Sequence, residues 1–115
     1  MKQSRMLKTW AEYTRILSHG GRVEDRDFTL FFYRKSGKWP RLGILVSKRL
    51  GKAVKRNRCR RLLKESYRLN QELFGSAIDI IIKAKRDISQ LAFKEIEANL
   101  IKLGKAIIED TPGRI

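Results

Sequence analysis

The chain has 115 residues, of which 42% are hydrophobic and 34% are charged, and its formal net charge at pH 7 is +15. This length suits one domain with a single core, and we expect residues 1–115 to form it. The sequence has no apolar run long enough to span a membrane, no apolar stretch of a secretory signal near its start, and a single cysteine that cannot form an internal disulfide. These features predict a cytoplasmic protein that does not enter a membrane.

The first half of the chain predicts one helix followed by a small antiparallel sheet. Residues 7–18 have the apolar spacing of an amphipathic helix, and Gly20-Gly21 predicts its end. The predicted strand segments are 23–26 (an edge strand or a turn), 28–34 and 41–48, with a loop at 35–40 between the last two.

Strand 28–34 is aromatic on both of its faces. Phe28, Leu30 and Phe32 share one face, and Phe31 and Tyr33 lie on the other. One of these two faces must therefore be covered by the first helix or left open.

The segment Lys48–Arg68 carries a formal charge of +9, which is more than half of the excess in the whole chain. From about Ala53 it predicts a helix with an apolar stripe: Cys59, Leu62, Leu63, Ser66 and Leu69. The opposite side carries Arg56, Asn57, Arg60, Arg61, Lys64 and Arg68, a cationic rod roughly 18 Å long. Like charges four residues apart repel in an isolated helix, and no acidic residue lies among them. A polyanion would relieve this repulsion, and the excess of arginine favours phosphate because the guanidinium group can bind two oxygens at once.

The remaining elements are a buried strand at 77–84 and an amphipathic helix at 90–108, with the basic helix ending near Gly75. This order predicts an α+β sandwich with a small sheet. From the pattern alone, the strand–helix–strand crossover would be right-handed, as in roughly 98% of such units.

The sequence offers no convincing catalytic or metal site in the polypeptide. His19 lies at a predicted helix end, and Asp25 and Asp27 flank an arginine in a polar turn. Asp79 has no second carboxylate near it in sequence, and Cys59 lies on the apolar stripe, where a packing role is favoured. We therefore expect this polypeptide to bind, and another molecule to perform any cleavage.

The run Leu50–Lys64, LGKAVKRNRCRRLLK, resembles the signature of the bacterial ribonuclease P protein component, which is built around an RNR segment. Small Ala53, the Arg56-Asn57 pair and basic residues at 60, 61 and 64 stand at the expected spacing. The resemblance covers nearly the whole chain. It implies the order α-β-β-β-α-β-α, with a small mixed sheet and a rare left-handed crossover through the basic helix.

In the family that this run resembles, a large RNA removes the 5′ leader of precursor tRNA, and the Mg2+ ions lie on the RNA. The resemblance implies that the protein binds two RNA partners, the catalytic RNA and the leader. The implied RNA-binding residues are Lys48, Arg49, Lys52, Arg56, Asn57, Arg58, Arg60, Arg61, Lys64 and Arg68. The positions that match the family's leader-binding cleft are Tyr13, Leu17 and Phe31.

Three positions depart from the family pattern. Family members often carry Phe at position 17 and Tyr at position 31, and Leu17 has no π-face on which a base could stack. Tyr13 and Phe31 can still stack leader bases without regard to their sequence. Many relatives carry an aliphatic residue at position 83, so Lys83 suggests that the last strand ends earlier or emerges at an edge.

Three other functions compete with this interpretation. A ribosomal protein would also be small and basic, but often adds disordered basic extensions that this chain lacks. A DNA-binding protein would need base-reading amides along the basic helix, where Asn57 is the only one, so we expect no DNA partner. A protein-only nuclease would need a cluster of carboxylates, which the sequence does not provide.

Overall fold

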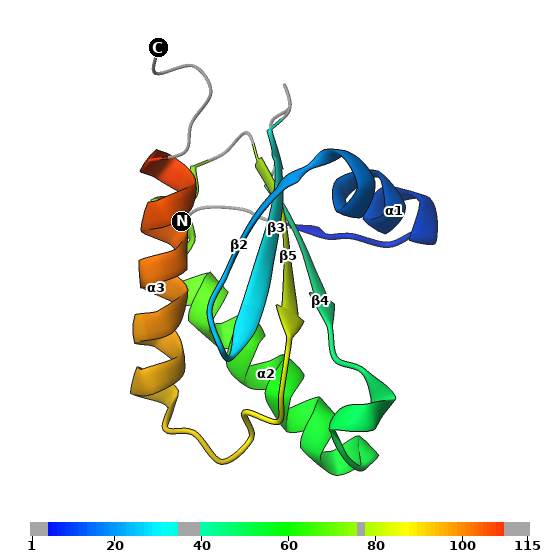
Figure 1. The fold of residues 1–115 in the computed structure, drawn as a ribbon, viewed down its shortest axis with the longest axis vertical. Coiled ribbons are helices and arrows are strands. Elements are labelled where there is room, and N and C mark those ends of the chain that lie inside the picture. The colour runs from blue at the N-terminus through cyan, green and yellow to red at the C-terminus, as the bar shows by residue number, and fades with distance from the viewer. Residues whose placement is uncertain (1–4, 35–39, 76–77, 110–115) are drawn as a thin grey trace.

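The computed structural model describes residues 5–34, 40–75 and 78–109, and within them it confirms the predicted α+β class (Figure 1). The elements are β1 (Arg5–Met6), α1 (Trp10–His19), β2 (Gly21–Glu24), β3 (Phe28–Arg34), β4 (Arg41–Leu45), the short 3-10 helix η1 (Lys48–Leu50), α2 (Ala53–Asn70), the 3-10 helix η2 (Gln71–Leu73), β5 (Ile78–Ala84) and α3 (Phe93–Glu109). Residues 35–39, which make up most of the predicted loop, lie outside the described part.

The strands form one mixed sheet in the order β1-β4-β5-β3-β2. Central β5 is antiparallel to β3 and parallel to β4, and β1 pairs in parallel with β4. Helix α2 therefore connects two neighbouring parallel strands, and the left-handed sense of this crossover stays a prediction. Strand β1 was missed in the sequence because two residues are too few to show an alternating pattern.

The two faces of the sheet are covered by different helices, because alternate residues of each strand point to opposite sides. Phe28, Leu30 and Phe32 face the main core beneath α2 and α3. Phe31 and Ile81 face the opposite side, where α1 packs (Figure 1). The second aromatic face is thus covered by α1, although only in part, since Phe31 is half-buried.

The apolar stripe of α2 is confirmed except at its last position. Cys59, Leu63 and Ser66 are buried and Leu62 is half-buried, whereas Leu69 is 52% exposed. At 3.6 residues per turn, Tyr67 and Leu69 lie about 80° to either side of Cys59 on the helix. The core lies on the Tyr67 side, so Tyr67 is buried and Leu69 reaches the surface.

The prediction made from Lys83 was wrong. Strand β5 continues to Ala84 and lies in the middle of the sheet, with Lys83 paired to Thr29 on one side and Leu45 on the other. The Lys83 side chain is exposed because it points to the α1 face, and ten-residue α1 does not cover that end. A lysine can therefore occupy a central strand without being buried.

Candidate nucleic-acid interface

The chain enters α2 through a sharp turn that brings several basic residues together. Gly51 has φ = 139°, a backbone conformation that favours glycine, and it separates η1 from α2. Lys52 caps the helix without a side-chain hydrogen bond, and the first turn contains no acidic residue. The positive end of the helix dipole therefore adds to the charges of the side chains around it. Lys48, Arg49 and Lys52 are all exposed here.

Arg60, Arg61 and Lys64 carry charges that no carboxylate in the described part of the chain neutralises by an ion pair. Arg60 donates a hydrogen bond to Asn57 Oδ1 at 3.0 Å, and Arg56 Nε donates to the Gly51 carbonyl oxygen at 3.2 Å. These contacts position the guanidinium groups and leave their charges uncompensated.

Two of the ten predicted RNA-binding residues are held differently. Arg68 pairs with Glu65 through two hydrogen bonds, of 3.0 and 2.6 Å, which lower the pKa of the Glu65 carboxyl. Arg58 lies on the flank toward α3 and donates from Nε to the Ser89 carbonyl oxygen at 2.9 Å. The ten predicted residues therefore do not form one uniform surface.

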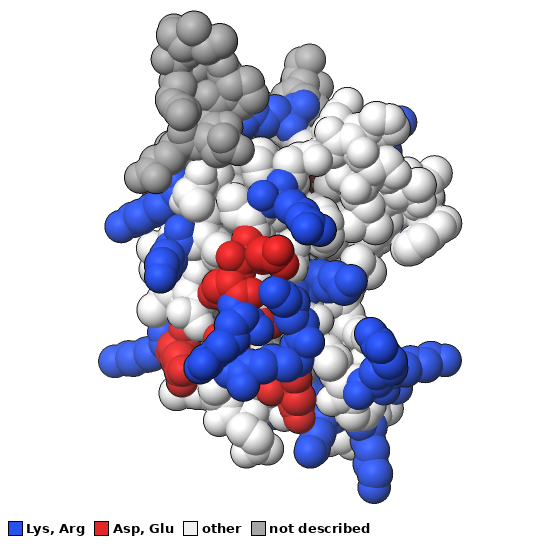
Figure 2. Space-filling model, viewed as in Figure 1, with Lys and Arg blue, Asp and Glu red and all other residues white. Residues whose placement is uncertain are grey.

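Charges are arranged differently near β2, where acidic and basic side chains are intermixed (Figure 2). Glu24 pairs with Lys85 at 3.0 Å, and Asp27 pairs with Arg86 at 2.6 Å. These charges largely offset one another, which distinguishes this region from the face of α2 that carries Arg60 and Arg61.

A hollow of about 370 Å³ connects the basic helix with α1. Arg60, Arg61 and Lys64 line it from α2, together with Asn57, and Tyr13 lines it from α1. Met6 and Ile44 complete the lining. Cationic groups, an amide and an aromatic ring thus face one concave surface.

The structure brings the three predicted cleft residues together. Tyr13, Leu17 and Phe31 are half-buried and pack around Ile16 and Ile81, between α1 and the sheet. Among the three, Tyr13 also lines the hollow beside α2. The group of predicted leader-binding residues and the basic face therefore meet at Tyr13.

Helix α1 begins with a capping box, in which side chain and backbone bond reciprocally. Glu12 N donates to Thr9 Oγ1 at 3.2 Å, and the Glu12 carboxylate accepts from the backbone N–H groups of Lys8 and Thr9 at 2.8 and 3.0 Å. These bonds, first that from Lys8, lower the pKa of Glu12, and the nearby Arg41 guanidinium lowers it further.

Arg41 ties α1 to the sheet. It donates two hydrogen bonds to Asp79, at 3.2 and 2.8 Å, and also pairs with Glu12. Asp79 is 1% exposed, so this arginine balances a buried charge. The sequence showed no second carboxylate near Asp79, because Glu12 comes from a distant helix and shares the arginine with it.

Gly43 allows α1 to approach the sheet closely. A Cβ atom at this position would lie 2.7 Å from a Tyr13 ring carbon and 2.8 Å from Leu7 Cδ1. The position of the Tyr13 ring therefore depends on the absence of a side chain at residue 43.

Trp10 lies within the helix predicted over residues 7–18, and the sequence interpretation did not identify it as a surface group. Trp10 is 69% exposed and stacks on Tyr13, with ring centroids 6.2 Å apart and an interplanar angle of 19°. The three-residue spacing of two aromatic residues, which places them side by side on a helix, was the available signal.

The surroundings of His19, Asp25 and Cys59, which were considered as catalytic or metal-binding candidates, fit structural roles. His19 is exposed, and Asp25 accepts hydrogen bonds from the backbone of Asp27 and Phe28 at 2.8 and 3.0 Å, as expected for a turn. Cys59 is 1% exposed, and burial raises the pKa of its thiol. In the described residues, no three His, Cys, Asp or Glu side chains gather in a way that could hold a metal ion.

None of the described helices combines the length and apolar character that crossing a membrane requires.

A cationic helix face beside a hollow that contains a tyrosine ring, on a small α+β fold, is typical of proteins that bind nucleic acid. Residues 1–107 match the family model described as Ribonuclease P. The chain is 37% identical over 105 residues to the ribonuclease P protein component of Pelotomaculum thermopropionicum, covering 91% of this chain and 94% of that relative. It is 34% identical over 100 residues to that of Clostridioides difficile, covering 86% and 88%.

Solved structures agree with these sequence matches. The ribonuclease P protein of Thermotoga maritima superposes with a TM-score of 0.80 at 25% identity, covering 90% of this chain and 97% of that one. The protein from Staphylococcus aureus gives 0.79 at 29% identity, covering 91% and 96%. The chain therefore belongs to the ribonuclease P protein family, which places it in tRNA processing as part of a ribonucleoprotein.

Proposed function

We propose that this protein binds the catalytic RNA of ribonuclease P through α2 and holds the 5′ leader of precursor tRNA beside α1. The RNA performs the Mg2+-dependent cleavage that removes the leader, and the protein contributes binding. The contacts to the catalytic RNA come from η1, the turn after it and α2: Lys48, Arg49, Lys52, Arg56, Asn57, Arg58, Arg60, Arg61, Lys64 and Arg68.

The observation that carries this proposal is the hollow that α2 shares with α1. Arg60, Arg61 and Lys64 supply positive charge there, without ion pairs to carboxylates among the described residues. Tyr13 supplies an aromatic surface in the same hollow. An RNA strand in this position would meet phosphate-binding and base-stacking groups together, which is the arrangement that single strands require.

The leader would lie across Tyr13, Leu17 and Phe31. Stacking on an aromatic side chain contributes about 1–3 kcal/mol per base and depends little on base identity. Leu17 offers apolar contact only. A leader of variable sequence can be held in this way, since the contacts do not read base edges.

We assign the Mg2+ to the phosphates of the RNA. The residues that line the hollow between α1 and α2 are cationic, amide, aromatic and apolar, a set that suits RNA phosphates and offers no carboxylate to a metal ion. No step of the cleavage is assigned to a protein side chain.

The experiment adds the protein to the catalytic RNA at a low Mg2+ concentration and measures correct 5′ cleavage of precursor tRNA. We expect the protein to restore cleavage that the RNA alone does not achieve, and the Arg60→Ala/Arg61→Ala double variant to do so poorly. Processing by the protein without the RNA, or an absence of stimulation, would contradict the proposal.

A further inference from the structure

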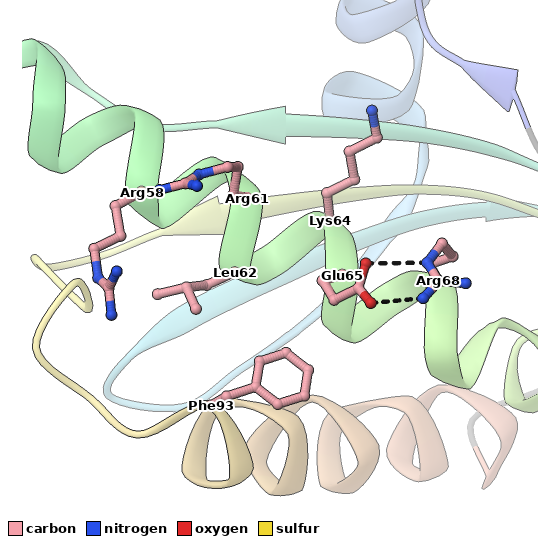
Figure 3. A pocket seen from close by; sticks show the side chains of 7 residues that line it. All are labelled: Arg58, Arg61, Leu62, Lys64, Glu65, Arg68 and Phe93. Atoms are coloured by element: carbon pink, nitrogen blue, oxygen red, sulfur yellow. Dashed lines mark hydrogen bonds and ion pairs between the residues drawn. The ribbon is translucent and has the colours of Figure 1, made fainter.

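A second hollow, of about 420 Å³, lies on the other flank of α2, between this helix and the first residue of α3 (Figure 3). Its volume falls within the range of about 300–1,000 Å³ that is usual for ligand pockets. Helix α2 contributes most of the lining, and Phe93 contributes from α3. None of the predicted leader-binding residues lines it.

The floor of this hollow is apolar. The Phe93 ring rises from α3 toward α2, and Leu62 lines the hollow from the α2 side (Figure 3). Both residues are half-buried, so each keeps part of its surface accessible from the hollow. An aromatic ring beside an aliphatic side chain offers a flat apolar surface of the kind on which a nucleobase stacks.

The rim carries four cations and one acid: Arg58, Arg61, Lys64, Arg68 and Glu65. Two of these cations have positions fixed by hydrogen bonds. Arg58 is held by the Ser89 carbonyl oxygen at 2.9 Å, and Arg68 is held by Glu65 at 3.0 and 2.6 Å. The net positive rim favours an anionic occupant, and fixed side chains lose little conformational entropy when it binds.

Arg61 and Lys64 line both this hollow and the one that contains Tyr13. They form a ridge between the two, so RNA bound along α2 would reach both concavities. The apolar floor distinguishes the second hollow from a purely electrostatic contact surface.

We propose that this hollow binds one nucleotide of the catalytic RNA, with its base on Phe93 and Leu62 and its phosphates at the cationic rim. The inference rests on the proposed function, because it requires α2 to be the surface that contacts the catalytic RNA. It adds a base-stacking contact to a helix that otherwise offers charge, and it assigns that contact to a residue of α3.

The test measures the affinity of the full chain for its cognate ribonuclease P RNA at several salt concentrations. Phe93→Leu keeps apolar volume and removes the ring, so we expect affinity to fall about 5- to 150-fold, which corresponds to the loss of one stacked base. The slope of log affinity against log salt should not change, because no phosphate contact is lost. Phe93→Trp should retain the affinity, and Lys94→Ala, a change at the next residue of α3 but outside the hollow, should leave it unchanged.

Arg61→Ala separates this inference from the proposed function. If Arg61→Ala weakens binding and flattens the salt dependence while Phe93→Leu has no effect, α2 binds RNA and the nucleotide site is overturned. If neither variant changes binding, the proposed function fails as well. If Phe93→Leu and Phe93→Trp both lose RNA affinity and both have a lower melting temperature, Phe93 serves packing. That result would also overturn the nucleotide site.

Discussion

The arginines of α2 differ in what their guanidinium groups contact. Arg68 has a carboxylate partner three residues earlier, whereas Arg60 and Arg61 have none among the described residues. An exposed pair such as Arg68–Glu65 contributes little to stability, but it offsets the charge that a phosphate would otherwise meet. Arg68 should therefore contribute less to the electrostatic part of RNA binding than Arg60, Arg61 or Lys64.

The double variant Arg60→Ala/Arg61→Ala tests this distribution. Each lost phosphate contact lowers the slope of log affinity against log salt by about 0.7–0.9, so two lost contacts should lower it by about 1.4–1.8. The measurement is a salt titration of binding to the catalytic RNA. Lys105→Ala, which removes an exposed cation from α3, is the matched control and should leave the slope unchanged. An unaltered slope in the double variant would remove both arginines from the interface.

At the scale of elements, the sequence predicted the features that depend on the local pattern of apolar and polar residues. The bounds of β3 were predicted correctly because alternating aromatic residues fill both faces of the strand. Leu69 was placed wrongly because periodicity defines a stripe only to within about one residue on the helix surface, and the packing of Tyr67 decides which edge is buried.

The candidate site was less predictable than the elements, since its contacts join distant residues. The basic face could be read from one helix alone, and the leader-cleft residues came from a family resemblance. The Glu12–Arg41–Asp79 network joins three elements, and nothing in local spacing indicates it. The open end of the α1 face, which leaves Lys83 exposed, follows from the length of α1 relative to the sheet below it.

The anchoring of α1 should depend on pH through Glu12. Its folded-state pKa is lowered from the ordinary value of 4.5, so the ionised carboxylate stabilises the fold above about pH 4.5, and this contribution disappears as the pH falls through the lower folded value. Glu12→Gln keeps a hydrogen-bond acceptor and removes the charge. We expect a loss of about 0.3–1 kcal/mol in unfolding free energy at pH 7, the size of one charge at a helix N-terminus.

Urea unfolding of both proteins between pH 7 and pH 3 measures this effect. The difference between wild type and Glu12→Gln should shrink across the lower part of that range. Glu95→Gln removes an exposed acid from the first turn of α3, away from Arg41. This control separates the effect of the Arg41 contact from that of a charge at a helix N-terminus. A difference that stays constant with pH would show that the charge of Glu12 does not contribute.

A side chain at Gly43 should destabilise the fold because it would clash with the Tyr13 ring, and a second substitution at Tyr13 should relieve that clash. Gly43→Ala places a methyl group against the Tyr13 ring and should cost about 1–3 kcal/mol of stability, the usual range for overpacking. In a Tyr13→Leu background the same change should cost less, because the ring carbon nearest to the new methyl group is gone. Equal costs in both backgrounds, measured by urea unfolding, would show that Tyr13 is not the limiting contact.

At the scale of the whole molecule, the two proposed binding surfaces meet at one residue. Tyr13 belongs to the packed group between α1 and the sheet, and it also faces the hollow lined by Arg60 and Lys64. A substrate strand beside α1 and a catalytic RNA against α2 would therefore lie next to each other. Under the proposed function, this arrangement would let the protein position one RNA relative to the other by binding both.

The proposed leader contacts come from α1 and β3 and the proposed catalytic-RNA contacts from η1, the turn after it and α2, so the two sets should be separable in the assembled ribonucleoprotein. Tyr13→Leu and Phe31→Leu remove stacking surfaces while keeping apolar volume, so each should weaken binding of precursor tRNA by about 1–3 kcal/mol per lost stacked base. Binding of mature tRNA, which has no leader, should not change, and affinity for the catalytic RNA should stay near that of the wild type. The measurement compares the two tRNAs with the same assembled complex. An equal loss of affinity for precursor and mature tRNA would show that these aromatic side chains do not contact the leader. Among the described residues, α2 would then be the one proposed RNA-binding surface that remains.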